Sequence, residues 1–383
     1  MLSYSDLVQM ERSLRQRQML SLYVEGANGD PAKRDAWRAR VEDALRPLEQ
    51  VNENAPHDER EAFRTTVRAL HDFLRHQPPP VHAATFAVFV SNETLLHDAT
   101  LPVSLPTAAH WGHGMRVAPY LRAIRPERPV IVYVGGVKTA EVYEQQGDSL
   151  RRARRIKVPM VKQPTYHMGD APPPGFSANT RGRTKKDALD RDVQTATHRV
   201  AHEIVEQIRQ HSGDNAWMIV VGLPQVTHAV QEALPASLAA RTFIERAALA
   251  DETEKELARV TTAGVEALER RRQSTLVDEL IEEAAIGRRG VLGRDAVQQG
   301  LMERRVYEVL FSSRFADEAP DALEAIVTSA FEQSALCEAT RGPAEELLDR
   351  TGRGVGALLR YTVAANAAGA TSESLGSEEG LSR

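Results

Sequence analysis

Two short apolar runs that end in glycine constrain the fold of this chain more than any other feature. Residues 129–136 read PVIVYVGG and residues 216–222 read AWMIVVG. Apolar runs of this length, bounded by proline or glycine and rich in β-branched residues, are typical of strands buried on both faces. They belong to a series of three strands over 129–161, a helix over 186–211, the second apolar strand, a helix over 224–234 and a strand over 241–247. This order predicts a ribonuclease-H-like sheet, although a fold class does not establish a function.

Helix and strand patterns on both sides of this sheet predict two further α/β domains. Before it come a helix and a strand within 5–25, helices near 31–51 and 58–75, and strands at 85–91 and 93–103. After it, a charged helix leads to a unit that ends on the strand GVGALLRY. We expect an N-terminal α/β domain at 1–127, the central ribonuclease-H-like domain at 128–250, a bridging helix at 251–285, a C-terminal α/β sandwich at 286–366 and a disordered tail at 367–383.

The strongest charge feature is a basic segment at 151–191, which begins in the third strand and runs into the helix. It holds eleven lysines and arginines against three aspartates, a net charge of +8, whereas the whole chain carries −5 and the remainder therefore −13. A local reversal of charge attracts a polyanion, and RNA phosphate is the first candidate. The alternative is a solvated charged loop, but loops of about 20 residues without their own structure are usually functional or disordered. The candidate RNA-binding residues are Arg151, Arg152, Arg154, Arg155, Lys157, Lys162, His167, Arg181, Arg183, Lys185 and Lys186.

Cysteine content and hydropathy indicate a protein of the cytoplasm. The single cysteine, Cys337, excludes an intramolecular disulfide framework and fits a reducing compartment. It falls inside a strand-like run, which favours the role of a small buried hydrophobe. The first residues lack the apolar core of a signal peptide, and no apolar run approaches the ~20 residues of a membrane span. We therefore expect no membrane partner.

Two pairs of histidines have spacings that a metal site could use. His198 and His202 lie four apart on the predicted helix, but a zinc-protease motif needs a second histidine where Glu206 stands. His110 and His113 have no cysteine nearby, which favours surface or packing roles. The chain also lacks a phosphate-binding loop of the Gly-x-x-x-x-Gly-Lys-Ser type. We expect no metal and no cofactor.

The C-terminal motifs resemble those of a known superfamily of translation factors. Residues 300–313, GLMERRVYEVLFSS, indicate a helix that leads into a strand, and residues 354–361, GVGALLRY, end the unit. Both resemble the C-terminal domain of the archaeo-eukaryotic peptide release factor and Pelota superfamily, and the order of elements is similar over residues 125–365. The chain is most similar to the bacterial branch, that of the Balon-like factors. The matching positions are Val306, Leu310, Gly354, Gly356, Ala357, Leu359, Arg360 and Tyr361.

This resemblance implies a ribosome-binding translation factor that acts in hibernation or in the rescue of stalled ribosomes. Its partners would be rRNA and tRNA, with the N-terminal domain at the decoding region and the long basic loop at the peptidyl transferase region. The C-terminal domain would contact a ribosomal protein or a translational GTPase such as elongation factor Tu.

The chain departs from release factors at the loop that carries their Gly-Gly-Gln motif, because this motif is missing here. Gly135 and Gly136 precede a valine and are interpreted as a strand-to-strand turn, where glycine permits positive φ. We therefore expect no peptidyl-tRNA hydrolysis and no enzyme activity. Two other classes stay open. One is a hydrolase or nuclease, although the two apolar strands lack the carboxylates that a two-metal nuclease needs; the other is a protein-interaction adaptor that uses the acidic remainder of the chain.

Overall fold

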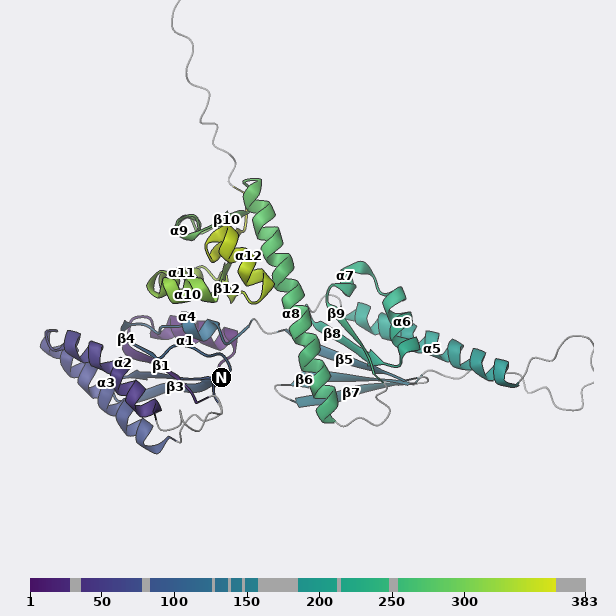
Figure 1. Ribbon diagram of the computed structural model, residues 1–383, viewed down its shortest axis with the longest axis horizontal. Helices are drawn as coiled ribbons and strands as arrows, with labels where there is room; N and C mark the ends of the chain where they lie inside the picture. Colours follow the sequence, from purple (N-terminus) through teal and green to yellow (C-terminus); the bar gives the residue numbers. More distant parts are fainter. Residues whose placement is uncertain are drawn as a thin grey trace, which may run out of the picture. The chain divides into compact units, whose positions relative to one another are not determined.

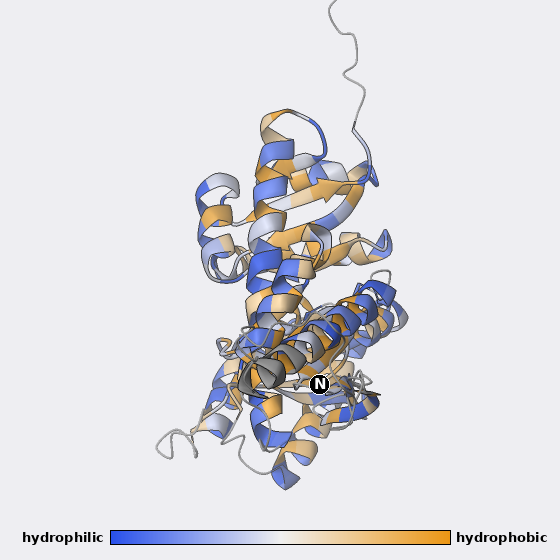
Figure 2. Cartoon of the chain, turned by 90° about the vertical axis from the view of Figure 1, so that its right-hand side faces the viewer, coloured by the Kyte–Doolittle hydropathy of each residue, from blue (hydrophilic) through white to orange (hydrophobic). Residues whose placement is uncertain are grey.

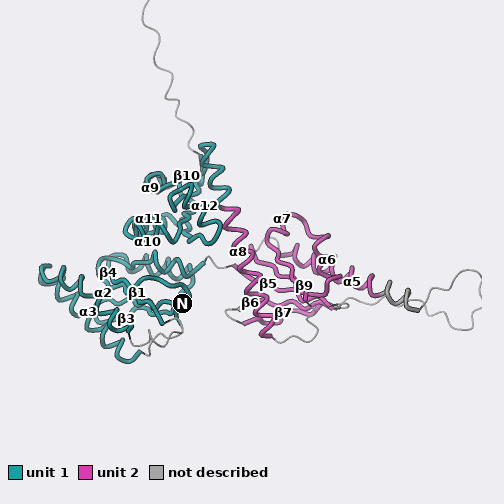
Figure 3. Tube along the Cα trace, viewed as in Figure 1, with its two compact units in different colours: residues 1–125, 277–383 teal, residues 126–276 magenta. Residues whose placement is uncertain are grey.

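The chain forms two compact units, which Figure 3 colours separately. Unit 1 comprises Met1–Arg125 and Val277–Arg383, and unit 2 comprises Pro126–Leu276. The predicted disordered tail at 367–383 lies outside the described residues. The residues that this computed structural model describes are 1–27, 36–77, 83–125, 128–136, 139–146, 149–157, 185–211, 215–247 and 254–362.

The first part of unit 1 is an antiparallel sheet in the order β3-β2-β1-β4, with helices α2 and α3 on one face (Figure 1). Leu20 and Leu22 of β1 pack with these helices, whereas Met19 and Tyr23 face a second core on the other side. Burial on both faces explains why the sequence of β1 lacks the alternation of a half-exposed strand. The elements are α1 (Tyr4–Leu14), β1 (Gln18–Glu25), α2 (Trp37–Asn52), α3 (His57–His76), β2 (Thr85–Ser91), β3 (Thr94–Leu101), β4 (Ala108–His113) and α4 (Ala118–Leu121).

The second part of unit 1 is a mixed sheet in the order β10-β13-β11-β12, in which β11 and β12 are parallel. Its strands are drawn mainly in orange, the hydrophobic end of the scale, in Figure 2. The motif GVGALLRY forms β13, whose five residues are all buried. It lies between two strands, because β10 at residues 290–292 pairs with it on one side and β11 on the other. The elements are β10 (Gly290–Leu292), α9 (Arg294–Met302), β11 (Val306–Phe311), α10 (Ser313–Glu318), α11 (Pro320–Glu332), β12 (Leu336–Ala339), α12 (Pro343–Gly352) and β13 (Val355–Leu359).

One hydrophobic core joins the two parts of unit 1. Leu7 and Tyr120 from the first part belong to the same cluster of buried residues as Phe311, Phe331 and Leu359 from the second part. The sequence predicts these parts as separate domains, whereas in the structure they pack against each other within one unit. Unit 1 is therefore assembled from both ends of the chain.

A largely buried carboxyl group, Glu324 on α11, supports this contact. It accepts hydrogen bonds from the backbone N–H groups of Val117 at 2.7 Å and Ala118 at 3.0 Å. Burial raises the pKa of Glu324 to about 7, because the two N–H groups and Arg116, 3.9 Å away, offset only part of the lost hydration. The carboxyl group therefore titrates near neutral pH inside the contact between the two parts.

Unit 2 is a five-stranded sheet in the order β7-β6-β5-β8-β9. Strands β5, β6 and β7 form an antiparallel meander, and β8 and β9 run parallel to β5. This arrangement confirms the predicted ribonuclease-H-like order. The elements are β5 (Val130–Gly135), β6 (Thr139–Gln146), β7 (Ser149–Lys157), α5 (Lys185–Gln210), β8 (Trp217–Gly222), α6 (Pro224–Ala233), α7 (Ala236–Ala239), β9 (Thr242–Arg246) and α8 (Glu254–Ala285), which continues into unit 1.

The strands of unit 2 separate two cores. Ile131 and Tyr133 of β5 pack with α5 and α6, whereas Val130 and Val132 pack with α8 on the opposite face (Figure 1). Cover on both faces is what the continuous apolar sequence of β5 predicts. Val193 of α5, which stands at helical spacing with the buried Val200 and Ile204, is 40% exposed.

Close packing, and not positive φ, explains the glycines at the ends of β5 and β8. Gly135 and Gly222 are register partners. A Cβ atom on Gly222 would lie 2.4 Å from the carbonyl oxygen of Gly135, and one on Gly135 would lie 2.8 Å from Val226 Cγ1 on α6. Neither Gly135 nor Gly136 has a positive φ. The predicted strand-to-strand connection is confirmed, since β5 pairs with β6 in a hairpin and the Gly136 N–H donates to the Thr139 carbonyl at 2.8 Å, but neither glycine uses a positive φ there.

The raised pKa of Glu324 predicts a pH-dependent stability of unit 1. The folded state binds the proton more tightly than the unfolded state, so this contribution is fully present below pH 4.5 and is lost as the pH rises through about 7. Since 15% of the Glu324 side chain stays exposed, we expect the free energy of unfolding to fall by only about 1 to 2 kcal/mol over this pH range. Urea unfolding at pH 5 and pH 8 should show this loss in the parent and not in Glu324→Gln, whose side chain does not titrate. Equal pH dependence in both proteins would contradict the assignment.

Candidate nucleic-acid interface

The structure places four of the predicted RNA-binding residues together. Arg151, Arg152, Arg154 and Arg155 all lie on β7 and are all exposed. Lys157 ends the same strand, but its side chain lies outside the described residues. The side chains of Lys185 and Lys186, at the start of α5, also lie outside the described residues. The whole of Lys162, His167, Arg181 and Arg183 lies outside them as well.

Strand β7 is the edge of its sheet, and a bulge divides its arginines between the two faces. The register pairs Val142 with Arg154 and the next residue, Tyr143, with Arg152, so that Ala153 has no partner. Val142 belongs to the core under α5 and Tyr143 to the core under α8. Because register partners share a face, Arg154 and Arg151 lie on the α5 side, whereas Arg152 and Arg155 lie on the α8 side. The edge therefore presents two guanidinium groups on each face.

On the α8 side, one carboxylate orients both arginines. Glu141 Oε1 lies 3.5 Å from Arg152 Nη1 and 3.5 Å from Arg155 Nε. The Tyr143 hydroxyl donates to Glu141 Oε2 at 2.7 Å, and burial together with this bond raises the pKa of Tyr143 to about 12. The two arginine side chains remain 59% and 53% exposed. Exposed ion pairs of this kind contribute at most about 1 kcal/mol, so both guanidinium groups stay accessible to a phosphate.

On the α5 side, an amide holds Arg154. Its Nη1 donates to Gln207 Oε1 at 3.2 Å, and Gln207 Nε2 donates to Glu203 Oε1 at 3.3 Å, one helical turn away. Gln207 is only 7% exposed, which restricts its side chain. Sequence reasoning missed both Glu141 and Gln207. The hairpin register was the available signal for Glu141, whereas Gln207 meets Arg154 only through the packing of α5 on the sheet.

Arginines on an edge strand fit two roles. A charged edge prevents pairing with the edge of another sheet. Guanidinium groups also bind phosphate through two parallel hydrogen bonds, and their attraction to RNA adds along a row. Strand β7 carries four exposed arginines, and Glu141 and Glu144 lie opposite two of them on the paired strand. The same strand leads directly into the basic segment, which favours the nucleic-acid role.

The histidine and cysteine positions weighed in the sequence take no part in a metal cluster. His198 and His202 are exposed on α5, and no group of three metal-ligating side chains occurs within the described parts of the chain. His110 lies 3.3 Å from Arg116 Nη1 through its Nδ1 atom, and His113 is exposed at the end of β4. Cys337 is 1% exposed in β12, which confirms the prediction of a buried small side chain.

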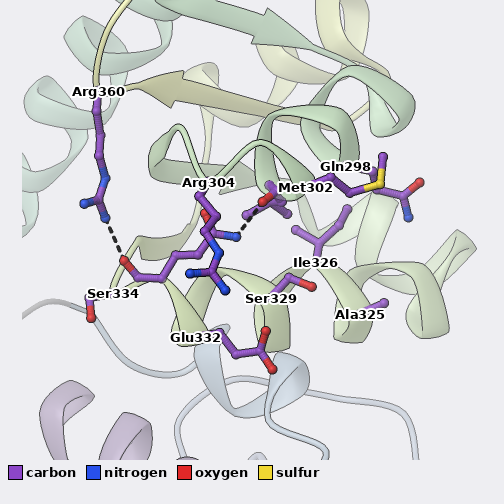
Figure 4. A pocket seen from close by; sticks show the side chains of 11 residues that line it. Gln298, Met302, Arg304, Ala325, Ile326, Ser329, Glu332, Ser334 and Arg360 are labelled. Carbon is purple, nitrogen blue, oxygen red and sulfur yellow. Dashed lines mark hydrogen bonds between the residues drawn. The ribbon is translucent and has the colours of Figure 1, made fainter.

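A hollow of about 780 Å³ lies between α9 and α11 in the second part of unit 1 (Figure 4). Two of its polar side chains already serve the fold. Arg360 donates to the carbonyl groups of Val306 and Gln333 at 3.0 and 2.7 Å, and Glu332 pairs with Arg15 at 2.5 Å.

No protein-family model matches the chain, and no curated protein matches it. Among solved structures it is similar to the archaeal translation termination factor aRF1, at 15% identity and a TM-score of 0.25 over 94% of this chain and 98% of that chain. Pelota from Archaeoglobus fulgidus has 14% identity and a TM-score of 0.39 over 72% of this chain and 79% of its own. Dom34 from S. cerevisiae has 10% identity and a TM-score of 0.34 over 62% of this chain and 64% of its own. These values leave the function to be argued from the residues of this chain.

Within the residues that the structure describes, no helix is both long and apolar enough to cross a membrane.

The geometry of Glu141 predicts how the edge responds to a change of charge. In Glu141→Gln, Arg152 and Arg155 lose their counter-charge. We therefore expect the variant to bind a 20-nucleotide RNA two- to fivefold more tightly at low salt, which is a gain in binding free energy of about 0.5 to 1 kcal/mol. The matched control is Glu232→Gln on α6, which removes a 63% exposed carboxylate of the same unit. Fluorescence anisotropy measures both complexes. Equal affinities for the two variants would show that RNA does not contact this face of β7.

Proposed function

We propose that this protein is a ribosome-binding translation factor related to peptide release factors. The observation that carries the proposal is the row of four exposed arginines on the edge strand β7. The row is the first part of the segment at 151–191, which carries +8 in all, while the rest of the chain sums to −13. Attraction to a polyanion is therefore concentrated at one place, which directs a large RNA to a defined surface.

The resemblance of the C-terminal motifs to the release factor and Pelota superfamily supports the ribosome as this RNA. In this proposal the arginines and the basic segment contact rRNA or tRNA, in hibernation or in rescue of a stalled ribosome in the cytoplasm. The C-terminal part of unit 1 contacts a translational GTPase such as elongation factor Tu or a ribosomal protein.

Charge reversal on β7 tests ribosome binding. We expect the variant with Arg151, Arg152, Arg154 and Arg155 replaced by glutamate to lose co-sedimentation with ribosomes, because four attractive contacts become repulsive. Replacement of the same four arginines by glutamine should reduce the magnitude of the slope of log affinity against log salt concentration by about 3. The reason is that each lost phosphate contact reduces this magnitude by about 0.7 to 0.9.

The matched control reverses four exposed arginines outside β7, which gives the same change of net charge. Arg46, Arg75, Arg259 and Arg314 have side chains 65%, 74%, 68% and 67% exposed. This control should sediment with ribosomes as the parent does. A β7 variant that is folded and still co-sediments would overturn the proposed contact.

We further propose that the protein does not hydrolyse peptidyl-tRNA. A catalytic loop at the ester needs small residues that let the backbone approach and a donor that orients water, and such positioning lowers the barrier by several kcal/mol. Between 158 and 184 the glycines are isolated, and the glutamine of this segment, Gln163, precedes a proline. This sequence supports anchoring to phosphate in place of catalysis.

Peptide release from ribosomes that carry labelled peptidyl-tRNA tests this part of the proposal. We expect release at the background rate, with a Gly-Gly-Gln factor as the positive control. Release at a rate comparable to that factor, lost on deletion of 166–184, would establish a hydrolase with an unorthodox loop and overturn the proposal.

A further inference from the structure

A cavity of about 700 Å³ lies between the two parts of unit 1. One side comes from β1, β4 and the residues around α4, and the other from α10 and α11. Its size falls within the range of small-molecule sites, roughly 300 to 1,000 Å³. The RNA-binding proposal makes no use of it, because the arginine row belongs to unit 2.

Apolar groups dominate the wall of this cavity. Its floor includes Tyr23 of β1, whose hydroxyl donates to the carbonyl group of Arg116 at 2.6 Å and is therefore occupied. The apolar lining favours a ligand with an apolar body, because burial of such a surface is the main source of affinity in a preformed pocket. The residues that supply this lining are Leu105, Pro106, Ala108, Ala109, Ala118, Pro119, Ala316, Pro320 and Leu323.

The charged residues of the cavity cancel one another. Arg116 Nη2 lies 2.6 Å from Asp321 Oδ1, and Arg122 Nη1 lies 2.7 Å from Asp317 Oδ1. The arginine side chains are 14% and 11% exposed, against 90% and 52% for the aspartates, so the carboxylates stand at the solvent side. Burial, together with Arg116, lowers the pKa of His110, which favours its neutral form. A charged ligand would lose hydration here without an unpaired counter-charge.

We propose that this cavity binds an uncharged, mostly apolar small molecule. The apolar wall holds the body of the ligand, and the paired charges of the wall leave no counter-charge for an ion. Residues from both ends of the chain line the site, so the bound ligand stabilises the packing of the two parts of unit 1.

Three probes of similar size separate the chemical classes: acetanilide, which is neutral with a carbonyl group, benzoate, an anion, and benzylamine, a cation. We expect the full-length protein to bind acetanilide in saturation-transfer NMR and to gain thermal stability with it, and to bind the two ions at least about tenfold more weakly, since an unpaired charge loses hydration.

Two substitutions that fill the cavity from different elements test its location. Ala316→Leu on α10 and Ala108→Leu on β4 should each abolish acetanilide binding while the melting temperature without ligand stays near that of the parent. The matched control is Ala325→Leu, which adds the same side chain to the hollow of Figure 4. Its acetanilide binding should be unchanged.

Three outcomes overturn the proposal. Absence of acetanilide binding would show that water alone fills the cavity. Tighter binding of benzoate or benzylamine would contradict the neutral class of ligand. If Ala316→Leu or Ala108→Leu folds and binds acetanilide as the parent does, acetanilide binds outside this cavity. One folded variant of the two is enough for this comparison.

Discussion

The hydrophobic core of unit 1 is the constraint on which the rest of the structure depends. It combines Leu7, near the start of the chain, with Phe331 and Leu359 near the end. Since both ends are committed to one core, the intervening chain at 126–276 has to fold on a core of its own and return through α8. This connectivity gives unit 2 an independent sheet, and the order of its strands sets the place of the arginines.

Within unit 2, the edge position of β7 links the fold to the proposed function. An inner strand would bury four guanidinium groups at a large cost in hydration, whereas an edge strand leaves them in water. Glu141 and Gln207 then limit their freedom without covering them. The edge thus combines accessible charge with fixed positions, and less conformational entropy is lost when a phosphate binds.

In unit 1, by contrast, several charged groups are paired with one another inside a contact. Glu324 and the pairs formed by Arg116 and Arg122 lie in the contact between its two parts, where each partner is largely satisfied. Apolar side chains and these paired charges line the cavity of about 700 Å³ between the two parts. A wall without an unpaired counter-charge is the physical basis of the proposed site for an uncharged small molecule.

Sequence alone determined the local features: the buried strands β5 and β8, the ribonuclease-H-like order of unit 2, the strand β13 and the concentration of basic residues on 151–157. These follow from periodicity and composition, which local burial imposes on neighbouring residues. Tertiary structure decided how the distant ends of the chain share a core, which face each arginine of β7 takes after the bulge, and that Gln207 meets Arg154. Such contacts join residues far apart in sequence, and only the packing of whole elements selects them, because no local pattern encodes a distant partner.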